Sequence, residues 1–151
     1  MTLLPLTTQH IEQGYQVHSS EQPSPWSKSV FSDCLTSPYF AYQLSLNEQL
    51  QGYYIGLQVL DEITLMDIAL KSEYQGQGWG KRLLDDFISQ CRLRKGSEIW
   101  LEVRESNVPA ISLYTAAGFE LIEKRKAYYE TAAGVEAVLI MRLILRGRRS
   151  T

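Results

Sequence analysis

A glycine-rich segment between an apolar strand and an amphipathic helix constrains the fold of this chain more than any other feature. Residues 63–70 form an apolar run, glycines occupy positions 76, 78 and 80, and apolar residues then recur at helical spacing from Leu83 to Cys91. Glycines leave the backbone N–H groups of such a turn unobstructed, and the helix N-terminus adds partial positive charge. The segment predicts an anion site, typically for phosphate; a flexible turn without a ligand is the alternative.

The spacing of these glycines excludes two familiar nucleotide-binding motifs. A P-loop requires a glycine at the position of Gln75, five residues before Gly80. A dinucleotide fingerprint requires the third glycine one residue later than it stands here. Lys81 and Arg82 follow in the first turn of the expected helix, where positive charge opposes the helix dipole. Their presence makes sense if an anion binds there.

Hydrophobic periodicity and turn residues predict the remaining elements. Strands are expected at residues 3–6, 39–46, 50–60, 63–70, 99–103, 119–122 and 135–145. Helices are expected from Thr7 or Thr8 to about residue 20, from Ser27 through Leu35, from the glycines to Gly96, and over 107–117 before Gly118. The fold class is therefore an α/β mixed sheet in one domain, residues 1–145, followed by a loose basic tail, residues 146–151.

Composition excludes several classes of protein. The 151 residues carry 15 Lys and Arg against 17 Asp and Glu, which is too balanced for a general nucleic-acid coat. The hydrophobic content of 44% excludes intrinsic disorder, and no apolar run approaches the roughly 18 residues of a membrane helix. Cys34 and Cys91, with His10 and His18, have no zinc-site spacing. We expect a cytoplasmic monomer without a signal peptide or a metal, binding neither membrane nor nucleic acid.

Two segments together resemble the GNAT superfamily of acetyl-CoA-dependent N-acetyltransferases. Residues Gln75–Gly80 resemble its Q/R-x-x-G-x-G/A motif, and residues Asn107–Phe119 resemble its N-x-x-A-x-x-L-Y-x-x-x-G-F segment, about thirty residues downstream. Either segment alone would be a weak signal, whereas the pair in this order is specific. The resemblance implies the GNAT acyl-CoA N-acyltransferase fold and acetyl-CoA as co-substrate.

A closer resemblance, over nearly the whole chain, is to a bacterial branch of this family. It rests on Pro25–Ser27, Trp100–Arg104 and Tyr128–Tyr129. Members of that branch acetylate the N-terminal alanine of protein eighteen of the small ribosomal subunit. One departure is that Glu136 is followed here by Ala137–Val138, where the branch has Asp-Ala. The alternatives are a GNAT enzyme for a lysine or a small-molecule amine, and a non-catalytic acyl-CoA-binding regulatory module.

The resemblance also implies roles for individual residues. Glu102 would be the general base and Tyr114 the general acid. The cofactor-binding residues would be Ile68, Ala69 and Leu70 for the pantetheine arm, Gly76, Gln77, Gly78, Trp79, Gly80 and Lys81 for the pyrophosphate, and Asn107. From the residues alone, Glu102 could be a solvated strand residue, Tyr114 a core residue and Asn107 a helix cap.

By analogy with the family, the acceptor is expected in a groove between Pro23–Lys28 and a loop at Tyr128–Glu136. An acidic rim would suit a basic ribosomal N-terminus, because opposite charges speed encounter. The candidate acidic residues are Glu21, Asp33, Glu130 and Glu136.

Overall fold

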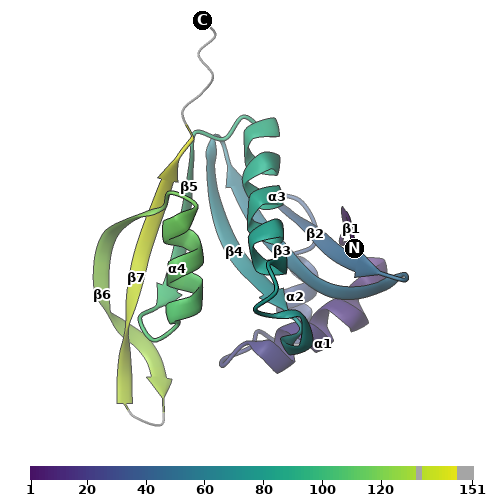
Figure 1. The fold of residues 1–151 in the computed structure, drawn as a ribbon, viewed down its shortest axis with the longest axis horizontal. Helices are drawn as coiled ribbons and strands as arrows, with labels where there is room; N and C mark the ends of the chain where they lie inside the picture. Colours follow the sequence, from purple (N-terminus) through teal and green to yellow (C-terminus); the bar gives the residue numbers. More distant parts are fainter. Residues whose placement is uncertain (132–133, 146–151) are drawn as a thin grey trace, which may run out of the picture.

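A seven-stranded sheet in the order β1-β2-β3-β4-β5-β7-β6 forms the framework of the computed structural model, which describes residues 1–131 and 134–145 (Figure 1). The strands are β1 (Thr2–Pro5), β2 (Tyr39–Leu46), β3 (Gln49–Val59), β4 (Glu62–Leu70), β5 (Glu98–Arg104), β6 (Glu120–Thr131) and β7 (Gly134–Ile144). Neighbouring strands are antiparallel except β4 and β5, which are parallel. The mixed α/β sheet predicted from the sequence is confirmed.

Helices cover both faces of the sheet (Figure 1). One face carries α3 (Trp79–Leu93) and α4 (Val108–Ala116), and the other carries α1 (Ile11–Glu21) and α2 (Lys28–Asp33). Short 3-10 turns, η1 (Thr8–His10) and η2 (Ser72–Tyr74), precede α1 and the glycine segment. Each face has its own apolar core: Leu83, Leu84 and Phe87 of α3 lie in the larger one, and Val17 and Phe31 in the smaller. Burial of these apolar side chains stabilises both layers.

The sheet divides between its two parallel strands. The described pairing of β4 with β5 covers only three positions, from Glu62↔Glu98 to Thr64↔Trp100. Beyond that point β4 continues to Leu70 and β5 to Arg104, and the two strands diverge (Figure 1). β5 stays paired with β7 along its whole length. The edge of β4 that faces β5 is therefore left without a strand partner over its last six residues.

A β-bulge in β4 lies at the start of this divergent part. Ile55 of β3 pairs with Asp67, whereas the next residue, Gly56, pairs with Leu65, so Met66 has no residue opposite. An extra residue inverts the alternation of side chains between the two faces. As a result, Leu65 lies in the core beneath α3, and Asp67 points to the other face and contacts α1.

Local capping residues mark the starts of α2 and α4 as the sequence predicts, whereas Thr7 caps the 3-10 turn η1 and α1 begins only at Ile11. The Oγ atom of Ser27 accepts a hydrogen bond from the backbone N–H of Val30, which begins α2. Asn107 caps α4 in the same way by accepting from Ala110 N–H at 3.3 Å. Gly118 follows α4 with φ +104°, the left-handed conformation expected of a glycine after a helix. Three helices end slightly before their predicted ends. The helix α2 ends at Asp33 instead of Leu35, α3 at Leu93 instead of just before Gly96, and α4 at Ala116 instead of residue 117.

The prediction for the last two strands is wrong in one respect. The sequence predicted that the sixth strand would end at Ile122 and that Tyr128–Glu136 would be a loop. Instead, β6 runs to Thr131 and pairs with β7 from Gly134 onward, so this segment belongs to a hairpin. β6 is an edge strand whose residues from 120 to 126 are all exposed, so charged side chains replace the apolar alternation that marks a buried strand. The expected basic tail, residues 146–151, lies outside the described residues.

Among the helices of the described segments, none combines the length and the apolarity that crossing a membrane requires.

Gly56 is packed too closely for a larger residue. A Cβ atom there would lie 2.5 Å from Cζ of Phe40 and 2.9 Å from Cε1 of Phe87, two rings that stack on each other. We expect Gly56→Ala to lower the free energy of unfolding by about 1–3 kcal/mol, because overpacking forces both rings to shift. Urea unfolding measures this change. In the control Gly80→Ala, the nearest atom to the new Cβ is Cδ2 of Leu113 at 3.8 Å, so stability should not fall. Equal stability of Gly56→Ala and the unaltered protein would contradict this packing.

Candidate active site

A cavity of about 860 Å³ occupies the divergence between β4 and β5. Its walls come from both faces of the sheet, since α3 and α4 contribute on one side and the segment between α1 and α2 on the other. The lining includes Leu65–Leu70 of β4, Leu101–Arg104 of β5, Gly76, Gly78, Gly80, Lys81, Asn107, Tyr114, and Gln22, Pro23, Ser24 and Trp26. The split in the sheet thus makes a passage between the two faces.

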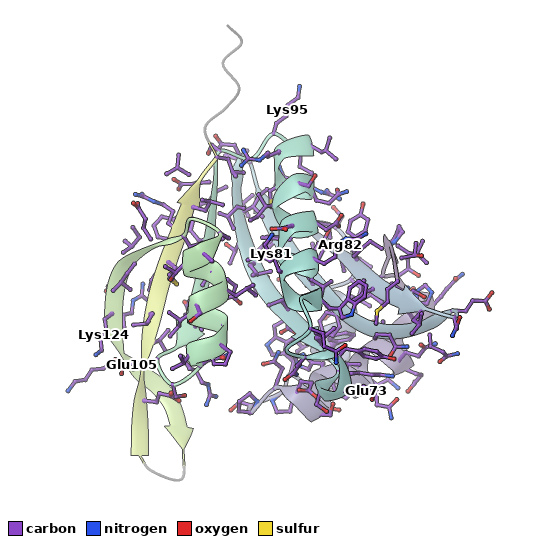
Figure 2. The ribbon with its side chains drawn as sticks, viewed as in Figure 1. Glu73, Lys81, Arg82, Lys95, Glu105 and Lys124 are labelled. Atoms are coloured by element: carbon purple, nitrogen blue, oxygen red, sulfur yellow. The ribbon has the colours of Figure 1, made fainter. Side chains whose placement is uncertain are left out.

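The glycine segment opens onto this cavity at the start of α3. Gly76 and Gly78 have φ values of +75° and +94°, and a Cβ atom at either position would meet no atom within 4 Å. No side chain of the described residues caps α3 at Gly78. Lys81 and Arg82 lie in its first turn (Figure 2), and Lys81 Nζ contacts Asp85 Oδ2 at 2.7 Å. Uncapped N–H groups, open space and nearby positive charge suit an anion.

Hydrogen bonds of two glutamine side chains brace the glycine segment. The Nε2 atom of Gln75 donates to Leu70 O at 2.8 Å and to Glu21 Oε1 at 3.0 Å. The Nε2 atom of Gln77 donates to Glu73 O at 2.9 Å. These bonds fix the segment to the end of β4 and to α1.

Two predicted cofactor-binding residues do not line the cavity. Gln77 points back to the preceding 3-10 turn, and Trp79, the first residue of α3, packs against the larger core. The remaining predicted residues of the glycine segment do line it, as do Ile68, Ala69 and Leu70. These three belong to the part of β4 whose edge has no partner strand on the β5 side. An extended ligand can therefore hydrogen bond to that edge as an added strand would.

Glu102 of β5 lies on the face of the sheet that α1 and α2 cover. Leu101 and Val103 are buried in the core beneath α3 and α4, so strand alternation places Glu102 on the opposite face, together with Arg104. Glu102 is exposed and lines the cavity. Its carboxylate is thus open to a molecule that enters from that face.

Tyr114 lies on the other side of the passage, in α4. It is only 6% exposed, and its ring centroid is 5.8 Å from that of Phe119. Burial, with a smaller contribution from the charge of Asp67, raises the pKa of Tyr114 well above its ordinary value. The phenol therefore keeps its proton at neutral pH. Tyr114 is both a core residue and a cavity residue, so the two readings of the sequence do not exclude each other.

A buried hydrogen-bond network centred on Asp67 was missed by the sequence analysis. Asp67 Oδ2 accepts from the hydroxyl of Tyr53 at 2.6 Å and contacts His18 Nδ1 at 2.7 Å, while Oδ1 accepts from Gln22 Nε2 at 2.6 Å. Burial and the nearby Asp67 raise the pKa of Tyr53 well above its ordinary value. The available signal was a carboxylate inside the apolar strand 63–70, because a buried charge requires partners.

Arg104 connects the segment between α1 and α2 to β7 at this end of the cavity. Its Nη2 atom donates to Ser24 Oγ at 3.1 Å, and its Nη1 atom lies 3.6 Å from Glu136 Oε1. Glu136 Oε2 also accepts from the backbone N–H of Ser106 at 2.8 Å. Hydrogen bonding with the side chain and then with the backbone of Ser106 lowers the pKa of Glu136. The segment between α1 and α2 is thereby linked through β5 to the β6–β7 hairpin.

The predicted acidic rim is only partly brought together. Glu21 lines the cavity, and Glu136 is engaged with Arg104 at its edge. Asp33, at the end of α2, does not line the cavity. The side chains of Tyr128–Glu130 lie outside the described residues.

Comparison with known proteins fits this geometry. A sequence model of the Acetyltransferase (GNAT) family matches residues 7–119. The chain belongs to the GNAT acetyltransferase family. It is 37% identical over 142 residues to the "[Ribosomal protein bS18]-alanine N-acetyltransferase" of Escherichia coli (strain K12), an alignment that covers 94% of this chain and 96% of that protein.

Solved structures of other acetyltransferases share the fold of this GNAT chain. The crystal structure of the ribosomal-protein-S18-alanine N-acetyltransferase from Escherichia coli superposes with a TM-score of 0.92 and 35% identity, covering 99% of this chain and 97% of that one. A GNAT family acetyltransferase from Elizabethkingia anophelis, solved with acetyl-CoA bound, has a TM-score of 0.77 and 22% identity, covering 95% and 97% of the two chains. The second likeness shows the shared fold alone.

GNAT enzymes use acetyl-CoA as the acetyl donor, and the cavity of this chain fits that molecule. The open space at Gly76 and Gly78 and the uncapped start of α3 suit a diphosphate. The unpartnered edge of β4 suits an extended chain that carries amide groups. In the described part of the chain, no group of three or more His, Cys, Asp or Glu side chains could hold a metal ion.

Proposed function

We propose that this enzyme transfers the acetyl group of acetyl-CoA to the α-amino group at a protein N-terminus, with the N-terminal alanine of ribosomal protein bS18 as acceptor. The observation that carries the proposal is the cavity between β4 and β5, which joins an anion-binding helix start on one face to an acidic wall on the other. The name of the Escherichia coli relative, together with its 37% identity over nearly the whole chain, supports the acceptor.

The cofactor residues follow from the two ends of the cavity. Gly76, Gly78 and Gly80 would present backbone N–H groups to the diphosphate, and Lys81 would add positive charge. Ile68–Leu70 would pair with the amide groups of the pantetheine arm. Asn107 caps α4 and lines the cavity, so its side chain could hold the start of that helix against the cofactor. Bound acetyl-CoA supplies the thioester that the amine attacks.

Glu102 is proposed as the general base. An α-amino group has a pKa of about 8, so about one molecule in ten is neutral at pH 7, whereas a lysine at about 10.4 is neutral only about four times in ten thousand. A terminal amine therefore needs little help to lose its proton. Glu102 is accessible on the acceptor side and would accept this proton directly or through one water molecule.

Tyr114 is proposed as the general acid. Its raised pKa keeps the hydroxyl protonated, and the residue lines the cavity on the cofactor side. Its hydroxyl would donate a proton to the sulfur of coenzyme A as the thiol is released. A thiol has a pKa of about 8.5, so only a modest donor is required.

The charges of the acceptor wall favour a cationic ligand. Glu21, Asp67 and Glu102 all line the cavity on the side of α1 and α2, and Arg104 is engaged with Ser24 and Glu136. Negative potential at an opening raises the local concentration of a positively charged peptide and its rate of encounter.

Acetyl transfer to synthetic peptides tests this proposal. We expect acetylation of a peptide with a free N-terminal alanine and no acetylation of the same peptide when its N-terminus is blocked, even if it contains lysine. Mass spectrometry locates the added acetyl group. Transfer to the lysine of the blocked peptide would favour an amine acceptor of a different class. Tight binding of acetyl-CoA without transfer to any amine would indicate a non-catalytic module.

A further inference from the structure

The segment that joins α1 to α2, residues 22–27, is tied at both ends to one buried carboxylate. At its start, the Nε2 atom of Gln22 donates to Asp67 Oδ1 at 2.6 Å. At its other end, the backbone N–H of Trp26 donates to His18 Nε2 at 2.9 Å, and His18 Nδ1 lies 2.7 Å from Asp67 Oδ2. Gln22 and Trp26 both line the cavity. Asp67 is therefore the common anchor of this wall.

The hydrogen bonds of His18 determine where its imidazole carries a proton. A backbone N–H can only donate, so Nε2 must be the unprotonated nitrogen that accepts from Trp26. The proton is then on Nδ1, which donates to the carboxylate of Asp67. His18 is 2% exposed, so water does not replace either bond. The neutral ring acts as a link that transmits the position of Asp67 to Trp26.

The backbone of Trp26 is held on both sides by α1. Its N–H is bound by His18, and its carbonyl oxygen accepts from the hydroxyl of Tyr15 at 2.7 Å. The ring centroids of His18 and Trp26 are 4.8 Å apart, so the two rings are also in contact. The next residue, Ser27, caps α2. The segment 22–27 belongs to no helix or strand up to Ser27, and these contacts hold it in one defined conformation.

We propose that His18 is a positioning residue that sets the affinity for the acceptor by holding Trp26, and with it the segment 22–27, against the cavity. This inference rests on the proposed function, because it assumes that the acceptor enters on this side. His18 does not take part in proton transfer with the substrate, since both of its ring nitrogens are already engaged. Its loss should therefore affect acceptor binding rather than acetyl-CoA binding or the chemical step.

Two substitutions of His18 separate its two hydrogen bonds. His18→Asn places an amide near the position of Nδ1, which keeps a donor for Asp67 and removes the acceptor for Trp26. His18→Gln places an amide oxygen near the position of Nε2, which keeps the acceptor for Trp26. We expect His18→Asn to raise KM for the alanine peptide roughly tenfold, with kcat and the acetyl-CoA Kd within about twofold of wild type. His18→Gln should restore most of the peptide KM.

Tyr15→Phe is a milder second variant, because it removes only the hydroxyl that holds the carbonyl oxygen of Trp26. It should raise the peptide KM in the same direction by a smaller factor, and it keeps the test valid if His18→Asn does not fold. An unchanged peptide KM in both variants would overturn the proposal. An equal rise of the peptide KM in His18→Asn and His18→Gln would also overturn it, as would a loss of acetyl-CoA affinity in parallel with the rise. Either result indicates a general structural role of His18.

Hydrogen exchange of the Trp26 amide tests the same link without a substrate. We expect this N–H to be protected in the wild-type protein, to exchange at least about tenfold faster in His18→Asn, and to recover protection in His18→Gln. If the wild-type enzyme acetylates no alanine peptide, the proposed function fails and the exchange rates decide the positioning role. Equal exchange in wild type and His18→Asn would reject that role.

Discussion

Gly78→Glu is expected to abolish measurable binding of acetyl-CoA. Gly78 is the residue from which α3 begins, and it has φ +94° in a place where a Cβ would meet only open space. A glutamate there would put a carboxylate where the diphosphate is proposed to bind, and like charges a few ångströms apart near a protein surface repel by about 4 kcal/mol. The left-handed conformation adds about 1–2 kcal/mol of strain for a residue with a side chain. We expect Kd to rise at least about a hundredfold.

Gly78→Ala is the matched control for this change. It introduces the same backbone strain without the charge, so it should lower stability by about 1–2 kcal/mol while costing much less of the acetyl-CoA affinity. Calorimetric titration with acetyl-CoA, together with thermal unfolding of each variant, separates the two effects. Normal acetyl-CoA binding by a folded Gly78→Glu protein would rule out the glycine segment as the diphosphate site.

Glu102→Gln and Tyr114→Phe are expected to lower kcat by about 10²–10⁴, the range for loss of a general base or acid. Each substitution removes the titrating group and nearly preserves the shape of the side chain. Because Glu102 is exposed, Glu102→Gln should change stability by less than about 0.5 kcal/mol. The acetyl-CoA Kd should stay within about twofold in both variants, since neither residue belongs to the glycine segment or to the edge of β4.

Glu105→Gln is the control for Glu102→Gln, because it also replaces a carboxylate by an amide. Glu105 lies just past the end of β5 and pairs at 2.6 Å with Lys124 of β6 (Figure 2), outside the cavity. We expect its kcat to equal that of wild type, because exposed ion pairs contribute little. Steady-state kinetics with the alanine peptide measures all three variants. Wild-type turnover in both Glu102→Gln and Tyr114→Phe would remove both assignments.

Much of the fold could be predicted because its signals are local. The glycines before α3 indicate where that helix begins. The helix α4 begins at its N-cap Asn107 and ends before Gly118, which has a left-handed backbone conformation. Such signals depend on a few neighbouring residues and on backbone geometry that only certain residues adopt. The candidate cofactor side of the site belongs to these same segments, so most of it was predicted with them.

The proposed acceptor side could not be predicted in the same way. Its central contact joins His18 to Asp67, 49 residues apart, and depends on the bulge at Met66, which no local pattern revealed. The early end of the β4–β5 pairing is likewise set by the packing of the whole sheet rather than by either strand's own residues. The predicted length of β6 was too short, because an exposed edge strand lacks the apolar alternation on which the prediction relied.

Because Met66 has no partner on β3, the residues on either side of it in β4 face opposite sides of the sheet. On its N-terminal side, Leu65 packs with the helices beside the proposed donor site, and on its C-terminal side, Asp67 anchors the opposite wall. If Met66 were paired regularly with β3, Asp67 would lie two residues after Leu65 and on the same face, in the apolar layer beneath α3. The bulge residue therefore decides which face of the sheet carries the carboxylate that holds His18 and Gln22, so the number of residues in β4 matters as much as their identity.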